Sequence, residues 1–352
     1  MNLVELERPE VEALVAGFDV PAFHGRQVFH WIWARGATEF GAMTDLSESL
    51  RASLAERCRI GIPEVETRQV SSDGTTKFLI RLADERRIEA VYVPDTPAQT
   101  LCVSTQVGCA MGCPFCLTGK MGLVRNLTAG EIAGQVLALA RDTGLHGSPF
   151  NVVLMGMGEP LHNYDATTKA LRILADRRGL ATPPRRVTLS TVGLLPELER
   201  LTQEEVMPNL AVSLHAADDE LRSELVPVNR KYHLADLIET CRRLPLPRRQ
   251  RITFEYVLLA GVNDRPEDAR RLVRLLGGLK AKINLLALNE APGIAFARPD
   301  DERVNTFAKE LAERGLTVSV RKSRGRDVRA ACGQLIVEGE RPATGEKVVA
   351  RL

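Results

Sequence analysis

Cys109-Ala-Met-Gly-Cys113-Pro-Phe-Cys116 places three thiols close together, directly after the apolar run at 100–107. A structural zinc site surrounds its metal with four protein ligands, and the usual iron–sulfur cluster is also held by four cysteines. Because the fourth ligand is missing locally, a 4Fe-4S cluster on Cys109, Cys113 and Cys116 would keep one iron free of protein. The stretch therefore predicts a cluster that binds a chelating substrate.

The rest of the chain has the composition of an ordinary globular protein. Its 352 residues are 44% hydrophobic, enough for one large domain of about 200 to 250 residues and a smaller one. The formal charge of +2, from 47 basic and 45 acidic residues, does not by itself mark a nucleic-acid binder. Evidence for such a partner must therefore come from local clusters of basic residues.

The amino-terminal residues and the cysteine count indicate the compartment. Residues 1–12 are acidic rather than basic and then apolar, and no uncharged apolar run approaches about 18 residues. We therefore expect a cytoplasmic protein with no membrane segment. Seven cysteines, an odd number, without a secretory signal favour reduced thiols used in metal or redox chemistry.

The first part of the chain predicts a small accessory unit. Residues 1–68 read as a helical accessory domain with helices at 9–15, 26–35 and 47–58. Its second helix mixes basic and aromatic groups, including His30, Trp31 and Trp33, which suit RNA stacking or simple core packing equally. Residues 69–94 show period-2 alternation with a turn at 71–74, which predicts a linking β-hairpin with strands at 77–82 and 87–93.

The main domain, predicted at 95–340 and followed by a tail at 341–352, alternates strands with helices. Six strands are expected, at 101–105, 151–156, 186–191, 209–215, 251–259 and 282–288. Helices are expected at 128–142, 166–176, 234–244, 266–276 and 301–314. This order predicts an α/β fold with a partial, open (β/α)6 barrel. Its chemistry should gather at the carboxyl ends of the strands, and the cysteine loop follows the first strand.

The cysteine spacing resembles that of the radical S-adenosylmethionine (SAM) superfamily, in which the amino and carboxylate groups of SAM chelate the open iron. Further polar residues follow the expected strands at the same edge of the sheet. Glu159 offers a carboxylate to the amino group of SAM, next to the bare backbone of Gly158. Singly, each such residue is typical of a turn or a strand-end cap, and their recurrence favours a SAM site. The expected SAM ligands are Gly158, Glu159, Ser190, Ser213, Leu214, His215 and Asn289.

Two cysteines outside the cluster motif also attract attention. Cys102 lies inside the first expected strand, where a small buried core residue is the ordinary reading. Cys332 lies in the glycine-bounded segment 325–335, directly after a basic tract. That tract suits phosphate contacts with RNA, although a solvated loop has the same composition. It comprises Arg321, Lys322, Arg324, Arg326 and Arg329.

Four stretches together resemble the dual-specificity RNA methyltransferases of the radical SAM superfamily. They are TLCVSTQVGCAMGCPFC at 100–116, MGMGEPLHN at 155–163, Ser213-Leu214-His215, and the segment 325–335. The resemblance covers nearly the whole chain. It implies methylation of carbon 2 of an adenosine in 23S ribosomal RNA, at the peptidyl transferase centre, and in transfer RNA, beside the anticodon. It also implies a 4Fe-4S cluster, two SAM molecules per turnover, an electron donor such as flavodoxin, and a monomer.

The resemblance also implies a role for each cysteine. Cys332 takes a methyl group from a first SAM, and a radical generated from a second SAM removes a hydrogen from that methyl group. The carbon radical then bonds to the adenine, Glu89 accepts a proton, and Cys102 releases the RNA by forming a disulfide with Cys332. A radical route suits carbon 2, because this electron-poor carbon does not act as a nucleophile toward a methyl donor.

Two alternatives stay open at this point. A sister group with the same five cysteines methylates carbon 8 of the same ribosomal adenosine, and no single residue separates the two outcomes. From a different class, the cysteines could hold zinc in a non-catalytic RNA-binding protein. Iron content would distinguish a cluster from zinc, and mass spectrometry of the product would distinguish the two carbons.

Overall fold

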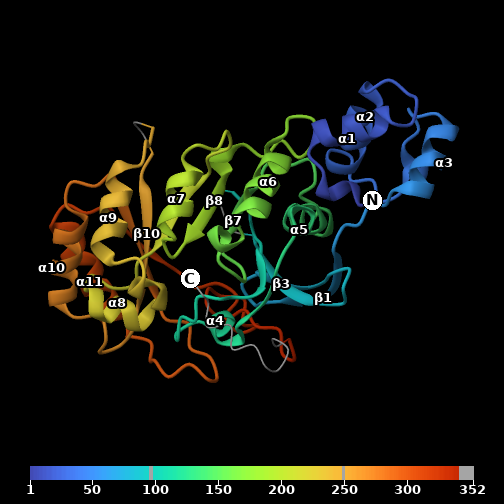
Figure 1. The fold of residues 1–352 in the computed structure, drawn as a ribbon. Helices are drawn as coiled ribbons and strands as arrows, with labels where there is room; N and C mark the ends of the chain where they lie inside the picture. Colours follow the sequence, from blue (N-terminus) through green and yellow to red (C-terminus); the bar gives the residue numbers. More distant parts are fainter. Residues whose placement is uncertain (95–97, 248–249, 341–352) are drawn as a thin grey trace.

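A ten-stranded mixed sheet forms the centre of the computed structural model, which describes residues 1–94, 98–247 and 250–340 (Figure 1). Its strand order is β1-β2-β3-β4-β7-β8-β9-β10-β11-β12. The strands are β1 (Glu64–Val70), β2 (Thr76–Arg81), β3 (Arg87–Val93), β4 (Thr100–Cys102), β7 (Asn151–Leu154), β8 (Val187–Thr191), β9 (Asn209–Ser213), β10 (Ile252–Leu258), β11 (Ala281–Ala287) and β12 (Val318–Arg321). A separate ladder pairs β5 (Gln106–Gly108) with β6 (Leu123–Asn126).

In the ten-stranded sheet, β4 and the strands from β7 to β12 are parallel and form the open barrel. The six predicted strands correspond to β4 and to β7 through β11, so the predicted fold class is confirmed. A seventh parallel strand, β12, pairs with β11 and was not predicted. It is short, and its two central residues are exposed, so its sequence lacks the apolar run of a buried strand. Within the described residues β1 and β12 are the two free edges of the sheet.

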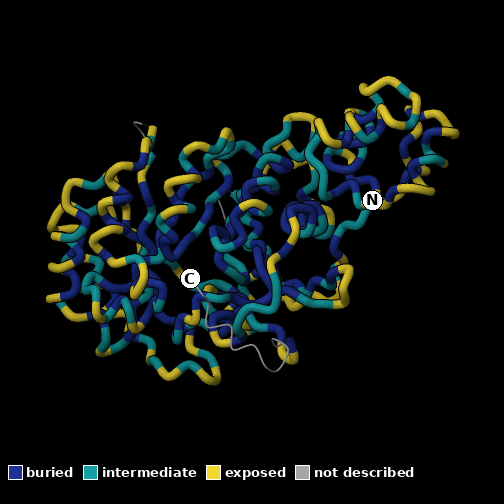
Figure 2. Tube along the Cα trace, in the orientation of Figure 1, coloured by how far each residue is buried: buried dark blue, intermediate teal, exposed yellow. Residues whose placement is uncertain are grey.

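Helices connect the parallel strands and cover the outside of the sheet (Figure 1). Their buried faces, together with the strands, make one continuous core (Figure 2). The α-helices are α1 (Arg8–Ala16), α2 (Phe23–Trp33), α3 (Glu48–Arg57), α4 (Leu117–Met121), α5 (Ala129–Asp142), α6 (Tyr164–Ala175), α7 (Leu195–Leu201), α8 (Asp219–Leu225), α9 (Leu234–Arg243), α10 (Pro266–Leu276) and α11 (Asp301–Glu313). Short 3₁₀ turns lie at Leu3–Glu5, Phe40–Ala42, Pro160–Asn163, Pro184–Arg186 and Pro227–Arg230. Within the described ranges no helix is long and apolar enough to cross a membrane.

The three predicted amino-terminal helices are confirmed as α1, α2 and α3. Helix α1 crosses α2 closely, because a Cβ on Gly25 would lie 2.4 Å from Cα of Glu12. Trp33 is fully buried, so core packing accounts for this aromatic residue. The unit docks on α5, where the carboxylate of Glu5 accepts hydrogen bonds from Thr128 Oγ1 and the Gly130 amide, both at 2.7 Å.

The predicted hairpin is also present, and it extends the main sheet. Strands β2 and β3 pair in antiparallel register, and β3 pairs in turn with β4, so that Val91 lies opposite Cys102. An additional strand, β1, precedes the turn at 71–74. The domain boundaries at 68, 94 and 340 stay predictions, and residue 95 and the tail 341–352 lie outside the described residues.

Candidate active site

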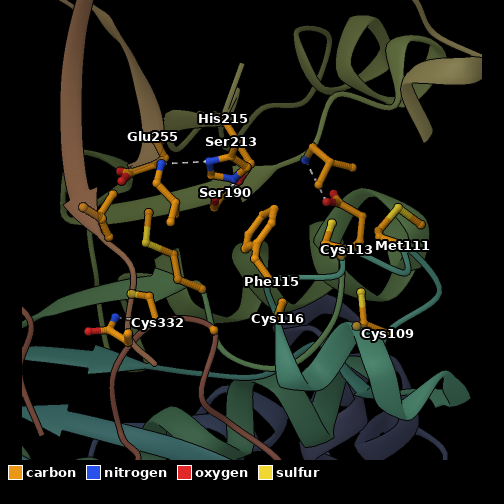
Figure 3. A pocket seen from close by; sticks show the side chains of 18 of the residues that line it. Cys109, Met111, Cys113, Phe115, Cys116, Ser190, Ser213, His215, Glu255 and Cys332 are labelled. Atoms are coloured by element: carbon orange, nitrogen blue, oxygen red, sulfur yellow. Dashed lines mark hydrogen bonds between the residues drawn. The ribbon is translucent and has the colours of Figure 1, made fainter. Parts of the chain in front are cut away.

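A cavity, partly open to solvent, lies at the carboxyl ends of the parallel strands (Figure 3). Ten of the residues predicted from the sequence line it: Cys109, Cys113, Cys116, Gly158, Glu159, Ser190, Ser213, His215, Asn289 and Cys332. Motifs that are more than 200 residues apart in the chain therefore meet in one place.

The loop that carries Cys109, Cys113 and Cys116, called the cluster loop below, owes its shape to glycines. Gly108, with φ of +78°, packs so tightly that a Cβ there would lie 1.9 Å from the Gly122 carbonyl oxygen. Gly122 O also accepts from the Cys109 amide at 3.0 Å, and the Cys116 amide donates to Cys113 O at 3.2 Å. The three thiols are thereby held on one wall of the cavity, as the sequence predicts (Figure 3).

Burial opposes ionisation of these thiols as long as no cation is near. It raises the pKa of Cys109 to about 12 and raises the pKa of Cys113, and neighbouring thiolates add to both effects. A positively charged iron–sulfur core compensates this cost, because thiolates are its ligands. Within the described residues no group of three or more His, Cys, Asp or Glu side chains could hold a single metal ion.

Gly158 and Glu159 form a rigid turn after β7. Gly158 has φ of +104°, and a Cβ there would lie 2.6 Å from the Cβ of Gln106, so only glycine fits. The Glu159 side chain is 3% exposed, and its two oxygens accept from the amides of Leu161 at 3.0 Å and Val192 at 2.9 Å. Burial raises the pKa of Glu159 to about 7, against the effect of these hydrogen bonds. A buried carboxylate at the cavity wall suits an ammonium group.

The ends of β8 and β9 supply hydroxyl and imidazole groups. Ser190 Oγ and Ser213 Oγ lie 3.4 Å apart, and both residues line the cavity. His215 Nδ1 accepts from the Val257 amide at 3.1 Å, which places the proton of the neutral ring on Nε2. Burial lowers the pKa of His215 to about 3, so the ring is neutral at physiological pH. Leu214 is fully buried and does not line the cavity, so only its backbone is available to a ligand.

Asn289 connects the wall of the cavity to Cys332. Its Nδ2 donates to the carbonyl oxygen of Cys332 at 3.1 Å. Its Oδ1 is buried and has no hydrogen-bond partner in the protein, although Asn289 lines the cavity. A buried amide oxygen without a partner costs stability, and a ligand N–H or O–H would satisfy it.

Cys102 approaches Cys332 through a second, smaller cavity. Both cysteines line this cavity, which shares Met155, Asn289, Arg321 and Cys332 with the first. Both are free thiols, Cys332 exposed and Cys102 half-buried. Burial raises the pKa of Cys102 to about 12 and a charged Cys332 raises it further, whereas the Arg321 guanidinium lowers it. The arrangement therefore brings the two thiols together beside one cation.

The loop that carries Cys332 is held from two sides. The turn between β1 and β2 holds its beginning, where Asp327 accepts from Ser71 Oγ at 2.5 Å and Asp73 accepts from the Gly325 amide at 3.1 Å. The start of α4 holds its end, because the Leu117 amide donates to the Gly333 carbonyl oxygen at 2.8 Å. Cys332 is thus fixed next to the cluster loop.

Glu89 lies on the sheet face beneath the segment that follows Cys332. Its carboxylate forms an ion pair with Lys77 at 2.8 Å and accepts from the Ile336 amide at 2.8 Å. Glu89 lines neither cavity. Burial raises its pKa, and the hydrogen bond and charge of Lys77 oppose this shift.

The comparisons with known proteins agree with this geometry. Residues 1–60 match the family described as "Ribosomal RNA large subunit methyltransferase N-terminal domain", and residues 103–273 match "Radical SAM superfamily". The dual-specificity RNA methyltransferase RlmN of Syntrophobacter fumaroxidans is 48% identical to this chain, over an alignment that covers 94% of this chain and 96% of the relative. The dual-specificity RNA methyltransferase RlmN of Geobacter sulfurreducens is 49% identical, over 95% of this chain and 92% of the relative.

The chain belongs to the RlmN family. A crystal structure of a radical SAM methyltransferase from Sphaerobacter thermophilus is also similar, with a TM-score of 0.91 and 47% identity over 95% of this chain and 99% of that one. As an RlmN-family member the chain is a radical SAM methyltransferase, with a 4Fe-4S cluster and SAM as its cofactors. The three thiols that line the cavity suit the cluster by their chemistry, and the unpartnered Asn289 Oδ1 fits a SAM donor group.

Two charged residues that line the cavity of this RlmN-family site were not predicted as part of it. Glu255 lines the cavity from the middle of β10 and accepts from Asn284 Nδ2 at 3.1 Å. A lone carboxylate in an apolar strand is the signal that could have identified it. Arg321 was predicted as an RNA phosphate contact in the basic tract, and that role stays a prediction. It lies on β12 and lines both cavities, because the tract begins inside a strand and not in a loop.

Proposed function

We propose that the chain methylates carbon 2 of an adenosine in large-subunit (23S) ribosomal RNA and in transfer RNA. The observation that carries the proposal is the meeting of Cys102 and Cys332 in a small cavity that adjoins the three-cysteine cavity. A methyltransferase that only displaces the methyl group of SAM needs neither thiol. The names of the relatives, "dual-specificity RNA methyltransferase", support RNA as the substrate.

Cys332 carries the methyl group in the proposed reaction. Its thiolate attacks the methyl carbon of a first SAM and S-adenosylhomocysteine leaves, and its exposed position gives it access to both SAM and RNA. When bound, the cluster and SAM together supply an organic radical by one-electron reduction, with an electron from a donor such as flavodoxin. Removal of one hydrogen atom from the methyl group on Cys332 leaves a carbon radical, which bonds to carbon 2 of the adenine.

Cys102 and Glu89 complete the proposed reaction. Glu89 accepts the proton lost from carbon 2, and its raised pKa makes it a stronger base than an exposed glutamate. The Ile336 amide covers one of its oxygens, so the segment after Cys332 has to shift for this transfer. The Cys102 thiolate then attacks the sulfur of Cys332, which breaks its bond to the methylene carbon. The released carbon takes up a proton, and the one unpaired electron left by the radical addition returns to the electron carrier that supplied the first electron. Reduction of the disulfide restores both thiols.

The proposed partner and setting follow from the same site. The target adenine has to leave its stack to reach a recessed cavity, so an unpaired or flipped base is expected. Lys322 and Arg324 line the second cavity beside Cys332, and they suit the phosphates that flank this base. We expect a monomeric protein that meets its RNA in the cytoplasm.

An anaerobic assay with methyl-labelled SAM tests the proposal. The reconstituted enzyme, a reductant and a ribosomal RNA fragment or a transfer RNA are incubated, and the digested nucleosides are separated by mass spectrometry. We expect 2-methyladenosine from the wild-type protein and no labelled nucleoside from Cys332→Ala. 8-Methyladenosine would replace the carbon 2 proposal with the carbon 8 alternative, and product from Cys332→Ala would remove the methyl-carrier role.

A further inference from the structure

A buried arginine without a direct ion pair lies behind the strand ends that line the cavity. Arg222, in α8, is 1% exposed and is one of the largest fully buried side chains. Its guanidinium donates four hydrogen bonds, all to uncharged oxygens: Nε to Leu214 O at 3.2 Å, Nη1 to Asn229 Oδ1 at 2.6 Å, and Nη2 to Val192 O at 2.7 Å and Ser213 O at 3.2 Å. Across residues 1–94, 98–247 and 250–340, no carboxylate forms an ion pair with it.

A buried charge without a partner is costly, so its position calls for a reason. The nearby carboxylate of Asp219 is occupied elsewhere, because it accepts from Asn229 Nδ2 at 2.9 Å and the Leu234 amide at 2.8 Å and contacts His233 Nδ1 at 3.0 Å. Burial lowers the pKa of Arg222 only to about 10, so the guanidinium stays positive at neutral pH. The protein therefore keeps in its interior a cation that the Asp219 carboxylate stabilises only without a direct ion pair.

The positive charge acts on the residues that hold the cofactors. It lowers the pKa of His215, whose ring centroid lies 4.9 Å from that of Phe115, between the second and third cluster cysteines. Two of the carbonyl groups that it binds belong to cavity-lining residues, Val192 and Ser213. A 4Fe-4S cluster on three thiolates carries a net negative charge, and reduction adds one more. A fixed cation bonded to two residues of the cavity wall stabilises the reduced form more than the oxidised form.

The same guanidinium also fixes the geometry of the strand ends. The Val192 amide donates to Glu159 Oε2 at 2.9 Å, and its carbonyl accepts from Arg222 at 2.7 Å. Residue 192 thus links the arginine to the carboxylate at the SAM site. The bonds to Leu214 and Ser213 hold the end of β9 in the same way.

We propose that Arg222 is a positioning residue that sets the reduction potential of the cluster, its buried positive charge favouring the reduced state. The inference rests on the cluster of the proposed function, and it adds to that function an account of how electron entry is made easier. No part of it depends on which carbon of the adenine is methylated.

The test compares two substitutions that separate charge from hydrogen bonding. Arg222→Gln removes the charge and keeps an amide that donates to the carbonyls, whereas Arg222→Lys keeps the charge and loses the planar fork. The control is Arg51→Gln, which also removes an arginine bonded to a carbonyl, that of Gly41 at 2.9 Å, but in the amino-terminal unit. Midpoint potentials are measured by electron paramagnetic resonance during anaerobic redox titration of each reconstituted protein, without RNA.

We expect Arg222→Gln to disfavour reduction on the order of tenfold, which corresponds to a potential about 59 mV lower for a one-electron couple. Arg222→Lys and Arg51→Gln should keep the wild-type potential. An unchanged potential in Arg222→Gln, or an equal drop in Arg222→Lys, would overturn the proposal. If Arg222→Gln does not assemble a cluster, Arg222→Lys decides alone: a wild-type potential supports the role of charge, and a tenfold loss refutes it. Because RNA is absent, this outcome is independent of the methylation assay.

Discussion

Replacement of Asp73 by Asn should loosen the loop that carries Cys332 and do so in a pH-dependent way. Asp73 lies in the turn before β2, 27% of its side chain is exposed, and its carboxylate accepts from the amides of Thr75 at 3.0 Å and Gly325 at 3.1 Å. An asparagine keeps one oxygen for Thr75 but turns an NH₂ group toward the Gly325 amide. One of the two anchors of the 325–332 loop is therefore lost.

The magnitude follows from the pKa of the carboxyl. Burial raises the pKa of Asp73, but hydrogen bonds from Thr75, Gly325 and Ser71 outweigh burial and lower it from 3.8 to about 2. At about 1.4 kcal/mol for each tenfold change in affinity for the proton, the difference is roughly 2.5 kcal/mol. Solvent screening of a partly exposed group reduces this, so we expect a loss of about 1–2 kcal/mol at neutral pH.

The sign of the pH dependence follows from the lowered pKa. A carboxyl whose pKa is lower in the folded chain contributes stability above its unfolded pKa, and this contribution disappears as the pH falls through the folded pKa. Urea unfolding of wild type and Asp73→Asn is followed by circular dichroism. The difference between the two proteins in free energy of unfolding should be full near pH 7 and smaller at about pH 3; this difference is the gap that the test measures. Asp19→Asn, at an exposed position, is the control. A gap that is constant or widens toward acid pH refutes the reasoning.

Three further outcomes test other parts of the site. Cys102→Ala should accumulate a covalent enzyme–RNA species on denaturing gels, because nothing releases the adduct, and normal turnover by this variant would exclude the resolving role. Gly158→Ala should cost about 1–3 kcal/mol from backbone strain alone, with lower urea midpoints and weaker SAM binding in equilibrium dialysis, since its φ is +104° and Gln106 blocks a Cβ. Wild-type protein reconstituted anaerobically should contain about four irons and be brown, and Cys113→Ala should lose most of the iron and colour; a full iron content in the variant would remove Cys113 from the ligand set.

The parts of the site that could be predicted are those encoded in local motifs. The cluster cysteines follow the first parallel strand, and Gly158 and Glu159 follow the second, so chain order alone places them at one edge of the sheet. Motif membership does not report side-chain direction, however. Leu214 lies between two cavity residues, yet its own side chain is buried in the core.

The residues that escaped prediction owe their roles to contacts between distant segments. A run of basic residues is ordinarily a solvated surface, so nothing in the sequence separates Arg321 from its neighbours. Only the pairing of β12 with β11 brings Arg321 to the two thiols. Arg222 is similar, because a charged residue on a short helix normally faces water, and its burial depends on carbonyl groups from two other strand ends.

The hairpin explains how two thiols from opposite ends of the main domain come together. Because β3 pairs with β4, the hairpin has a fixed position relative to Cys102. The turn between β1 and β2, at the start of the hairpin, binds the loop that leads to Cys332. On the other side of Cys332, the Gly333 carbonyl is bonded to the start of α4, next to the last cluster cysteine. Cys332 itself is exposed between these anchors. In the proposed reaction we therefore expect its sulfur to reach SAM, RNA and Cys102 mainly by side-chain rotation, and weakening either anchor should slow both methyl transfer and disulfide formation.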